Sequence, residues 1–289
     1  MQCDGAHLRI IAHELIALLE RLAALGPLPR VKRLLLPPPG ADGTHAGEFC
    51  AVELDDGSLG LSFVLLGDTL VQLRGGVGER LAAMPALELA RCYAESEGVQ
   101  RTLGFAAVNA LTRHLFDRAG YAPPAAQGST GDLALQPGDH VGMVGLFPPL
   151  VKQVLATGAR LTVVELREDL VGAHEGWHVT LDPAELRGCN KVLSTSTVLL
   201  NDTLDALLGH CRGAERIALI GPGASCLPDP LFERGVTLLG GSWIADAEGF
   251  RNALLAGTSW SGCARKTAIA RDAWPGAAAL LARAASVQR

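Results

Sequence analysis

The feature that most constrains the fold is a series of short, nearly continuous apolar runs in the second half of the chain. These runs are Val141–Val144, Leu161–Glu165, Lys191–Ser194, Arg216–Ile220 and Val236–Leu239. Their length and their Val, Ile and Leu content indicate strands that are buried on both faces, and the helical stretches between most of them indicate right-handed parallel crossovers. The sequence therefore predicts a Rossmann-like α/β domain with a parallel sheet.

The first half has a different pattern, in which strands come before helices. After a helix predicted over Leu8–Leu25, the expected strands are Val31–Leu36, Phe49–Leu54 and Gly60–Leu65, and the expected helices are Pro85–Glu95 and Thr102–Ala119. The sequence Asp55-Asp56-Gly57 lies between the second and third strands and is typical of a hairpin turn. This order predicts an α+β layer.

The best candidate for a domain boundary is the stretch 123–131, which is rich in Pro, Gly and small polar residues. A chain of 289 residues is long enough for two domains of ordinary size. We therefore expect an N-terminal α+β domain over residues 1–125 and a Rossmann-like domain over residues 131–289.

Composition bears on the classes of binding partner and on the cellular location. The formal net charge is only −5 and no basic block is present, so nucleic acid is not an expected partner. No apolar run is long enough to cross a bilayer and the N-terminus lacks the pattern of a signal peptide, so we expect no membrane partner and a cytoplasmic protein. Seven cysteines are spread singly without a Cys-x-x-Cys pair, which favours reduced thiols and gives no metal-ligand spacing.

Ligands of open parallel sheets bind beyond the carboxyl ends of the strands. At the first strand end, Gly142 and Gly145 allow close backbone approach, and Pro148 begins a helix whose N-terminal N–H groups could meet an anion. About twenty residues on, Glu165 ends the second strand where a dinucleotide fold has its ribose-binding carboxylate. The glycine spacing is Gly-x-x-Gly, however, which departs from the dinucleotide fingerprint.

Three further strand ends carry hydroxyl or glycine residues, and each has a purely structural alternative. The segment Ser194-Thr-Ser-Thr197 has more hydroxyls than one helix cap needs, although a cap remains an alternative. Gly221-Pro-Gly-Ala-Ser225 could be a ligand loop or a plain turn, and Gly241 follows the last strand. The glycines of the first strand end could likewise serve packing alone.

The same residues resemble the family described as a "putative heavy-metal chelation" domain. The resemblance is carried by Val141–Val151, Val163–Glu165, Ser194–Asp205, Ile220–Ser225 and Gly235–Ser242 with Asp246, and in the first half by Gly60–Ser62, Arg74–Gly76 and Leu103–Leu111. It implies an enolase N-terminal-like domain joined to a Rossmann-like domain, with a ligand cleft between the two. The chain departs from the family pattern Gly-Pro-Ser-Thr-Pro at Gly221–Ser225, which leaves the contacts of that loop in doubt.

The candidate ligand-contacting residues are Gly142, Gly145, Phe147, Pro148, Glu165, Ser194, Thr195, Ser196, Thr197, Asn201, Gly221, Pro222, Ser225, Gly241 and Asp246. No nucleophile elbow, phosphate loop or metalloprotease helix is present, so no catalytic residue is predicted.

The leading hypothesis is a protein that binds a small anionic or heteroaromatic metabolite between its two domains, in the synthesis or handling of a heavy-metal-chelating compound. The alternative is a Rossmann-type transferase or oxidoreductase with an adenosine-bearing cofactor, and a third reading is a scaffold for oligomer assembly. The cofactor stays open between a divalent metal and an adenosine-bearing molecule, and a homodimer is also left open.

Overall fold

The N-terminal half contains a three-stranded antiparallel sheet. The computed structural model describes residues 9–39, 48–128, 130 and 132–286, and within them the strands β1 (Val31–Leu35), β2 (Phe49–Leu54) and β3 (Leu59–Phe63) lie in that order. Strands β2 and β3 are joined by a tight turn in which Gly57 has a φ of 89°, a conformation that favours glycine. The predicted hairpin is confirmed.

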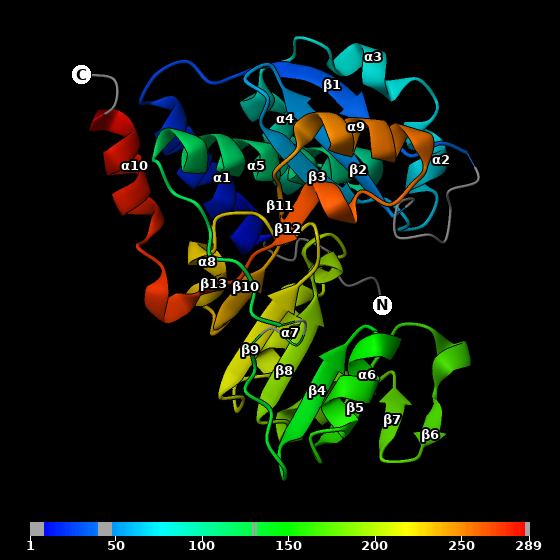
Figure 1. Cartoon of the computed structure of the whole chain (residues 1–289). Helices are drawn as coiled ribbons and strands as arrows, with labels where there is room; N and C mark the ends of the chain where they lie inside the picture. The colour runs from blue at the N-terminus through cyan, green and yellow to red at the C-terminus, as the bar shows by residue number, and fades with distance from the viewer. Residues whose placement is uncertain (1–8, 40–47, 129, 131, 287–289) are drawn as a thin grey trace, which may run out of the picture.

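Helices cover this sheet, and one of them is buried on nearly all sides (Figure 1). They are α1 (Ile10–Ala23), α2 (Thr69–Leu73), α3 (Val77–Leu81), α4 (Ala86–Glu95) and α5 (Gly98–Arg118). In α5 every residue from 101 to 112 is buried, because the helix packs against β3 on one side and against later parts of the chain on others. The short helices α2 and α3 were not predicted.

The second half forms an eight-stranded sheet in the order β13-β10-β9-β8-β4-β5-β7-β6. Its strands are β4 (His140–Val144), β5 (Arg160–Val164), β6 (Gly172–His174), β7 (Trp177–Thr180), β8 (Lys191–Thr195), β9 (Arg216–Ile220), β10 (Leu238–Gly240) and β13 (Ile269–Ala270). All neighbouring pairs from β10 to β7 are parallel, whereas β6 and β13 pair antiparallel at the two edges. The predicted parallel sheet is confirmed, and the strand order reverses between β4 and β8.

The connections explain this order. Helices α6 (Pro148–Leu155), α7 (Leu204–His210) and α8 (Asp229–Phe232) link successive parallel strands. Between β5 and β8, however, the chain forms the β6–β7 hairpin and the 3₁₀ helix η2 (Pro183–Gly188) in place of an α-helix. The carboxyl ends of β4 and β8 therefore lie side by side at the switch point, where open α/β sheets bind ligands.

The C-terminal part of the chain returns to the N-terminal layer (Figure 1). It contains β11 (Ser242–Ile244), α9 (Ala247–Ala256), β12 (Ala264–Lys266) and α10 (Ala277–Ser286). Phe250 and Leu254 of α9 are fully buried in one cluster with Leu35 and Phe49, while α10 packs on α1 and α5. The predicted boundary near residues 125–131 stays a prediction. The elements after residue 241 pack against the N-terminal sheet and its helices.

Within the described part of the chain, no helix is both long and apolar enough to cross a membrane.

Candidate functional site

A cavity of about 2030 Å³ lies between the N-terminal layer and the carboxyl ends of the parallel strands. Its floor is formed by the residues that follow β4, β5, β8, β9 and β10, and its roof includes Phe49, Phe63, Leu65, Tyr93 and Arg101. The parallel order of the strands brings their ends to one edge, and the layer braced by α9 and α10 covers that edge. The lining combines apolar side chains with charged and polar ones, and the volume exceeds the roughly 300–1,000 Å³ of a typical small-molecule site.

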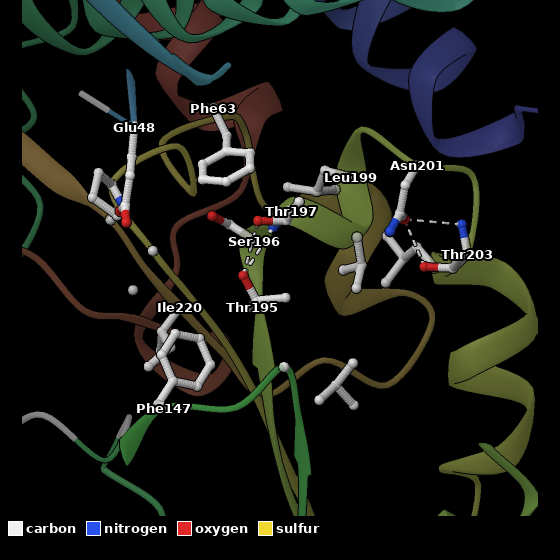
Figure 2. A pocket seen from close by; sticks show the side chains of 18 of the residues that line it. Glu48, Phe63, Phe147, Thr195, Ser196, Thr197, Leu199, Asn201, Thr203 and Ile220 are labelled. Carbon is white, nitrogen blue, oxygen red and sulfur yellow. Dashed lines mark hydrogen bonds between the residues drawn. The ribbon is translucent and has the colours of Figure 1, made fainter. Parts of the chain in front are cut away.

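Three consecutive hydroxyl residues lie at the end of β8, and we call Thr195, Ser196 and Thr197 the β8 hydroxyl cluster. Thr195 Oγ1 lies 3.0 Å from Thr197 Oγ1 and accepts a hydrogen bond from the Thr197 amide at 3.2 Å. Thr195 therefore caps the 3₁₀ helix η3 (Ser196–Leu199), as the structural alternative requires. All three residues also line the cavity (Figure 2), so the residues that form this cap also form part of the cavity wall.

Two glycines allow the neighbouring loops to approach this cluster. Gly145 has a φ of 84°, and a Cβ there would lie 3.2 Å from Cγ2 of Thr195. Gly221 has a φ of 147°, and a Cβ there would collide with Oγ of Ser196. Both positions line the cavity, as do Pro222 and Gly241. The backbones of the loops after β4 and β9 thus lie directly against the side chains of Thr195 and Ser196 at the end of β8.

Glu165 lies at the cavity and joins the ends of β4 and β5. Its carboxylate accepts hydrogen bonds from the amide of Leu146 at 2.6 Å and from the amide of Leu166 at 3.0 Å. The side chain therefore fixes the loop that follows Gly145. Contact between Glu165 and a ligand hydroxyl stays a prediction, since each carboxylate oxygen has a second lone pair.

The start of α6 differs from the expectation that it offers free N–H groups. Pro148 and Pro149 have no amide hydrogen, and the amides of Leu150 and Val151 already donate to the carbonyl of Phe147 at 2.8 and 3.0 Å. The expected free N–H groups are therefore not found at residues 148–151, and contact between an anion and this segment stays a prediction. Pro148 lines the cavity.

Aromatic rings from both halves of the chain border the β8 hydroxyl cluster. Figure 2 shows Phe63, at the end of β3, on one side of the cluster and Phe147, before α6, on the other. Phe63 is held by an edge contact with Phe49, whose centroid lies 5.7 Å away, and Phe49 in turn contacts Trp260 at 6.3 Å. The roof ring is thus supported by other aromatics, and the two faces could enclose a flat molecule.

The remaining predicted site residues are divided between the cavity and other places. Asn201 lines the cavity, where its Oδ1 accepts from the hydroxyl of Thr203 at 2.6 Å. The structure does not bring four others to the cavity: Gly142, Ser194, Ser225 and Asp246. Gly142 packs under Leu186 and Cys189, and Ser194 is buried inside β8. The Oγ of Ser225 donates to the carbonyls of Pro222 and Ser242 at 3.3 Å. Asp246 caps α9 by accepting a hydrogen bond from the Gly249 amide.

Sequence reasoning missed a charged group at one end of the cavity. Arg101, in the first turn of α5, and Arg9, just before α1, both lie beside Asp202, and all three line the cavity. Arg101 Nη1 is 2.7 Å from an Asp202 oxygen, and its guanidinium lies 5.1 Å from the centroid of Tyr93. An arginine at the start of the stretch 101–112, most of whose other residues are apolar or small, was the available signal.

Comparison with known proteins agrees with this architecture. Residues 130–271 match the DUF364 family model and residues 45–112 match the DUF4213 family model, and both are described as "putative heavy-metal chelation". A DUF364 crystal structure from Desulfitobacterium hafniense, of unknown function, covers 92% of this chain and 100% of its own with a TM-score of 0.65 and 22% identity. Residues 130–271 are thus a DUF364 domain, and residues 45–112 a DUF4213 domain.

Two further DUF364-related comparisons bear on fold and sequence. A DUF364 protein of unknown function from Pyrococcus horikoshii matches with a TM-score of 0.63 and 20% identity over 90% of this chain and 98% of its own. An uncharacterized protein of Methanocaldococcus jannaschii is 30% identical over 155 residues, which are 52% of this chain and 57% of that protein. The chain therefore spans little more than half of that relative. These likenesses support the two-domain α/β fold, whereas the enolase likeness stays a prediction.

The DUF364 description raises the question whether this chain itself holds a metal. Among residues 9–39, 48–128, 130 and 132–286, no three His, Cys, Asp or Glu side chains converge on one point. Burial raises the pKa of Cys189 to about 11 and the pKa of Cys50, Cys211 and Cys226 to about 12. Burial therefore keeps these thiols protonated in the absence of a metal, but a bound metal would itself lower the pKa of a coordinating thiol. The described residues thus contain no preformed group of three metal ligands.

Proposed function

We propose that the protein binds a small organic molecule in the cavity, in the synthesis or handling of a compound that chelates heavy metals. The observation that carries this proposal is the β8 hydroxyl cluster, which lies between Phe63 and Phe147 in a cavity of about 2030 Å³. Rings on two sides favour a flat, apolar body, and the hydroxyls can donate to or accept from polar atoms at its edge.

The family description is compatible with this proposal if the metal is carried by the ligand. Flat molecules are chelators when two or more of their nitrogen and oxygen atoms are placed to bind the same metal ion, and a protein that binds such a molecule needs no metal-ligating side chains of its own. The lack of a converging His, Cys, Asp or Glu group in the described ranges then agrees with the description. The proposed ligand class is accordingly a heteroaromatic molecule with polar edge atoms.

Binding can be tested with the purified full chain. We expect a heteroaromatic molecule with polar edge atoms, such as a pyridine dicarboxylate, a pterin or a purine, to raise the melting temperature, because a ligand at 100 times its Kd stabilises by about 2.7 kcal/mol. Bare divalent metals, S-adenosylmethionine and nicotinamide cofactors are tested in parallel. Stabilisation by a bare metal alone, or by an adenosine cofactor alone, would contradict the proposal, as would no response to any heteroaromatic compound.

Variants locate the bound molecule. Thr197→Val keeps the side-chain volume and removes one hydroxyl of the β8 hydroxyl cluster, so we expect the Kd to rise by about two- to tenfold, the equivalent of one hydrogen bond. Phe147→Ala removes one ring and should weaken binding further. Thr157→Val is the matched control, because its hydroxyl donates to the Val154 carbonyl at the end of α6 and does not line the cavity. Equal affinity in Thr197→Val and Thr157→Val would locate the ligand elsewhere.

A further inference from the structure

We propose that Arg101 and Arg9 form an oxyanion-binding subsite at one end of the cavity, which the carboxylate of Asp202 fills when no ligand is bound. This inference rests on the proposed function, since it assigns a carboxylate or phosphate group to the ligand of the same cavity. We call Arg9 and Arg101 the arginine subsite. Asp202 then acts as an internal competitor that an incoming anion displaces.

The guanidinium of Arg101 is buried without enough acceptors. Its side chain is only 6% exposed, and within the described part of the chain its one aligned hydrogen bond runs from Nη2 to the carbonyl of Leu199 at 3.2 Å. Among the same residues Nε has no hydrogen-bond partner, and Nη1 is close to Asp202 without the geometry of a hydrogen bond. A buried guanidinium with unused donors is costly unless it gains acceptors, and a bidentate oxyanion provides two in one plane.

Asp202 satisfies Arg101 poorly, whereas Arg9 also donates to the carbonyls of Ala94 at 3.3 Å and Ser96 at 2.6 Å and to the carboxylate of Glu97 at 3.2 Å. The Asp202 carboxylate is shared between Arg101 Nη1 at 2.7 Å and Arg9, whose Nε and Nη2 both lie 3.4 Å away. The Asp202 backbone has a φ of 58°, in the left-handed region that costs energy for a residue with a Cβ. The side chain is 41% exposed, so leaving the arginines needs little other rearrangement.

The position of the subsite links it to the rest of the cavity. Asp202 follows the β8 hydroxyl cluster in the same segment, and Leu199 between them accepts hydrogen bonds from Arg101 and, at 2.8 Å, from the Tyr93 hydroxyl. Arg9, Arg101 and Asp202 line the same cavity as Thr195 and Thr197. A ligand could therefore have its ring between the phenylalanines and its anionic group at the arginine subsite.

The test measures the Kd of citrate and of inorganic phosphate by calorimetry at low ionic strength. Asp202→Asn removes the competing charge and keeps a residue that tolerates the left-handed region. If Asp202 occupies the arginines about nine-tenths of the time, its removal should tighten binding about tenfold. Arg101→Gln should abolish binding. Arg9→Gln should weaken binding, and this second variant leaves the buried side chains of α5 unchanged.

The matched control is Arg91→Gln, because Arg91 also lies on a helix and pairs with Glu20 at 2.9 Å but does not line the cavity. A gain of affinity on loss of Asp202 is a result that a purely structural ion pair would not give. Unchanged or weaker binding in Asp202→Asn, or equal binding in Arg9→Gln and Arg91→Gln, would overturn the inference. If the anions bind as expected and no heteroaromatic compound does, the subsite stands and the proposed function fails. If heteroaromatic compounds bind and the anions do not, the proposed function stands and the subsite fails.

Discussion

Asn109 connects the roof of the cavity to one of its floor loops, and its removal gives a sharp test of how the two are joined. The side chain is 1% exposed in the middle of α5, and its Nδ2 donates to the carbonyls of Leu61 at 2.8 Å and Gly223 at 3.0 Å. Asn109→Ala leaves both acceptors without this donor. A buried unsatisfied group costs about 1–3 kcal/mol, so we expect a loss of about 2–4 kcal/mol in the free energy of unfolding.

Equilibrium denaturation in urea measures this loss, with an unchanged slope as the sign that only stability has changed. Thr112→Val is the matched control, because Thr112 is buried on the same helix and its hydroxyl donates only to the Val108 carbonyl, at 2.9 Å. We expect that control to lose less than about 1 kcal/mol.

Hydrogen exchange adds a local readout of the same contact. The amides of Gly221, Gly223, Ala224 and Ser225 should exchange faster in Asn109→Ala than in Thr112→Val, because the loop has lost its bond to α5. Equal losses of stability in the two variants, together with equal exchange in this loop, would refute the reasoning.

Three other predictions follow from burial and charge. Gly60→Ala should destabilise by about 3 kcal/mol or more in denaturant titrations, because a Cβ on β3 would collide with the backbone of α5; a loss below 1 kcal/mol would contradict this packing. Burial alone would raise the pKa of Asp139, but hydrogen bonds from Lys191 and other donors lower this pKa below its ordinary 3.8. The ionised Asp139 therefore stabilises the fold above pH 3.8, and this stabilisation is lost as the pH falls through the lowered pKa. Denaturation from pH 6 to pH 2 should therefore show a steeper decline for the wild type than for Asp139→Asn, and parallel curves would argue against it. Iodoacetamide should label the half-buried Cys263 before Cys226, whose pKa burial raises to about 12, and mass spectrometry showing equal rates would count against the burial.

The parallel strands could be predicted because their signal is local. The apolar runs lie largely within the sheet core, and Arg216–Ile220 was predicted with its observed bounds, whereas β10 begins at Leu238 and not at Val236. The β6–β7 hairpin was missed because its strands are short, partly exposed and polar, so they lack an apolar run. The pair β11–β12 was missed for another reason, since α9 separates the two strands in sequence and nothing local specifies such a partner.

The candidate site was predictable on its floor and not on its roof. The hydroxyl and glycine residues of the floor follow directly after predicted strands, and the rule that parallel strands align their carboxyl ends brings them together without any knowledge of tertiary structure. The roof residues lie on a different sheet and its helices, where Phe63, Tyr93 and Arg101 are ordinary members of local patterns. Only the packing of one layer on the other turns them toward the floor.

Helix α5 shows how such residues could still be recognised. Its buried stretch, residues 101–112, combines mostly apolar or small residues with a few polar ones and is buried throughout. A polar side chain there must find a hydrogen-bond partner, because water cannot reach it. Thr112 finds one within the helix, whereas Arg101 and Asn109 reach loops of the cavity floor, the first beside Asp202 and the second at Gly223. Long polar side chains in the buried stretch of a helix therefore indicate where that helix contacts a neighbouring loop.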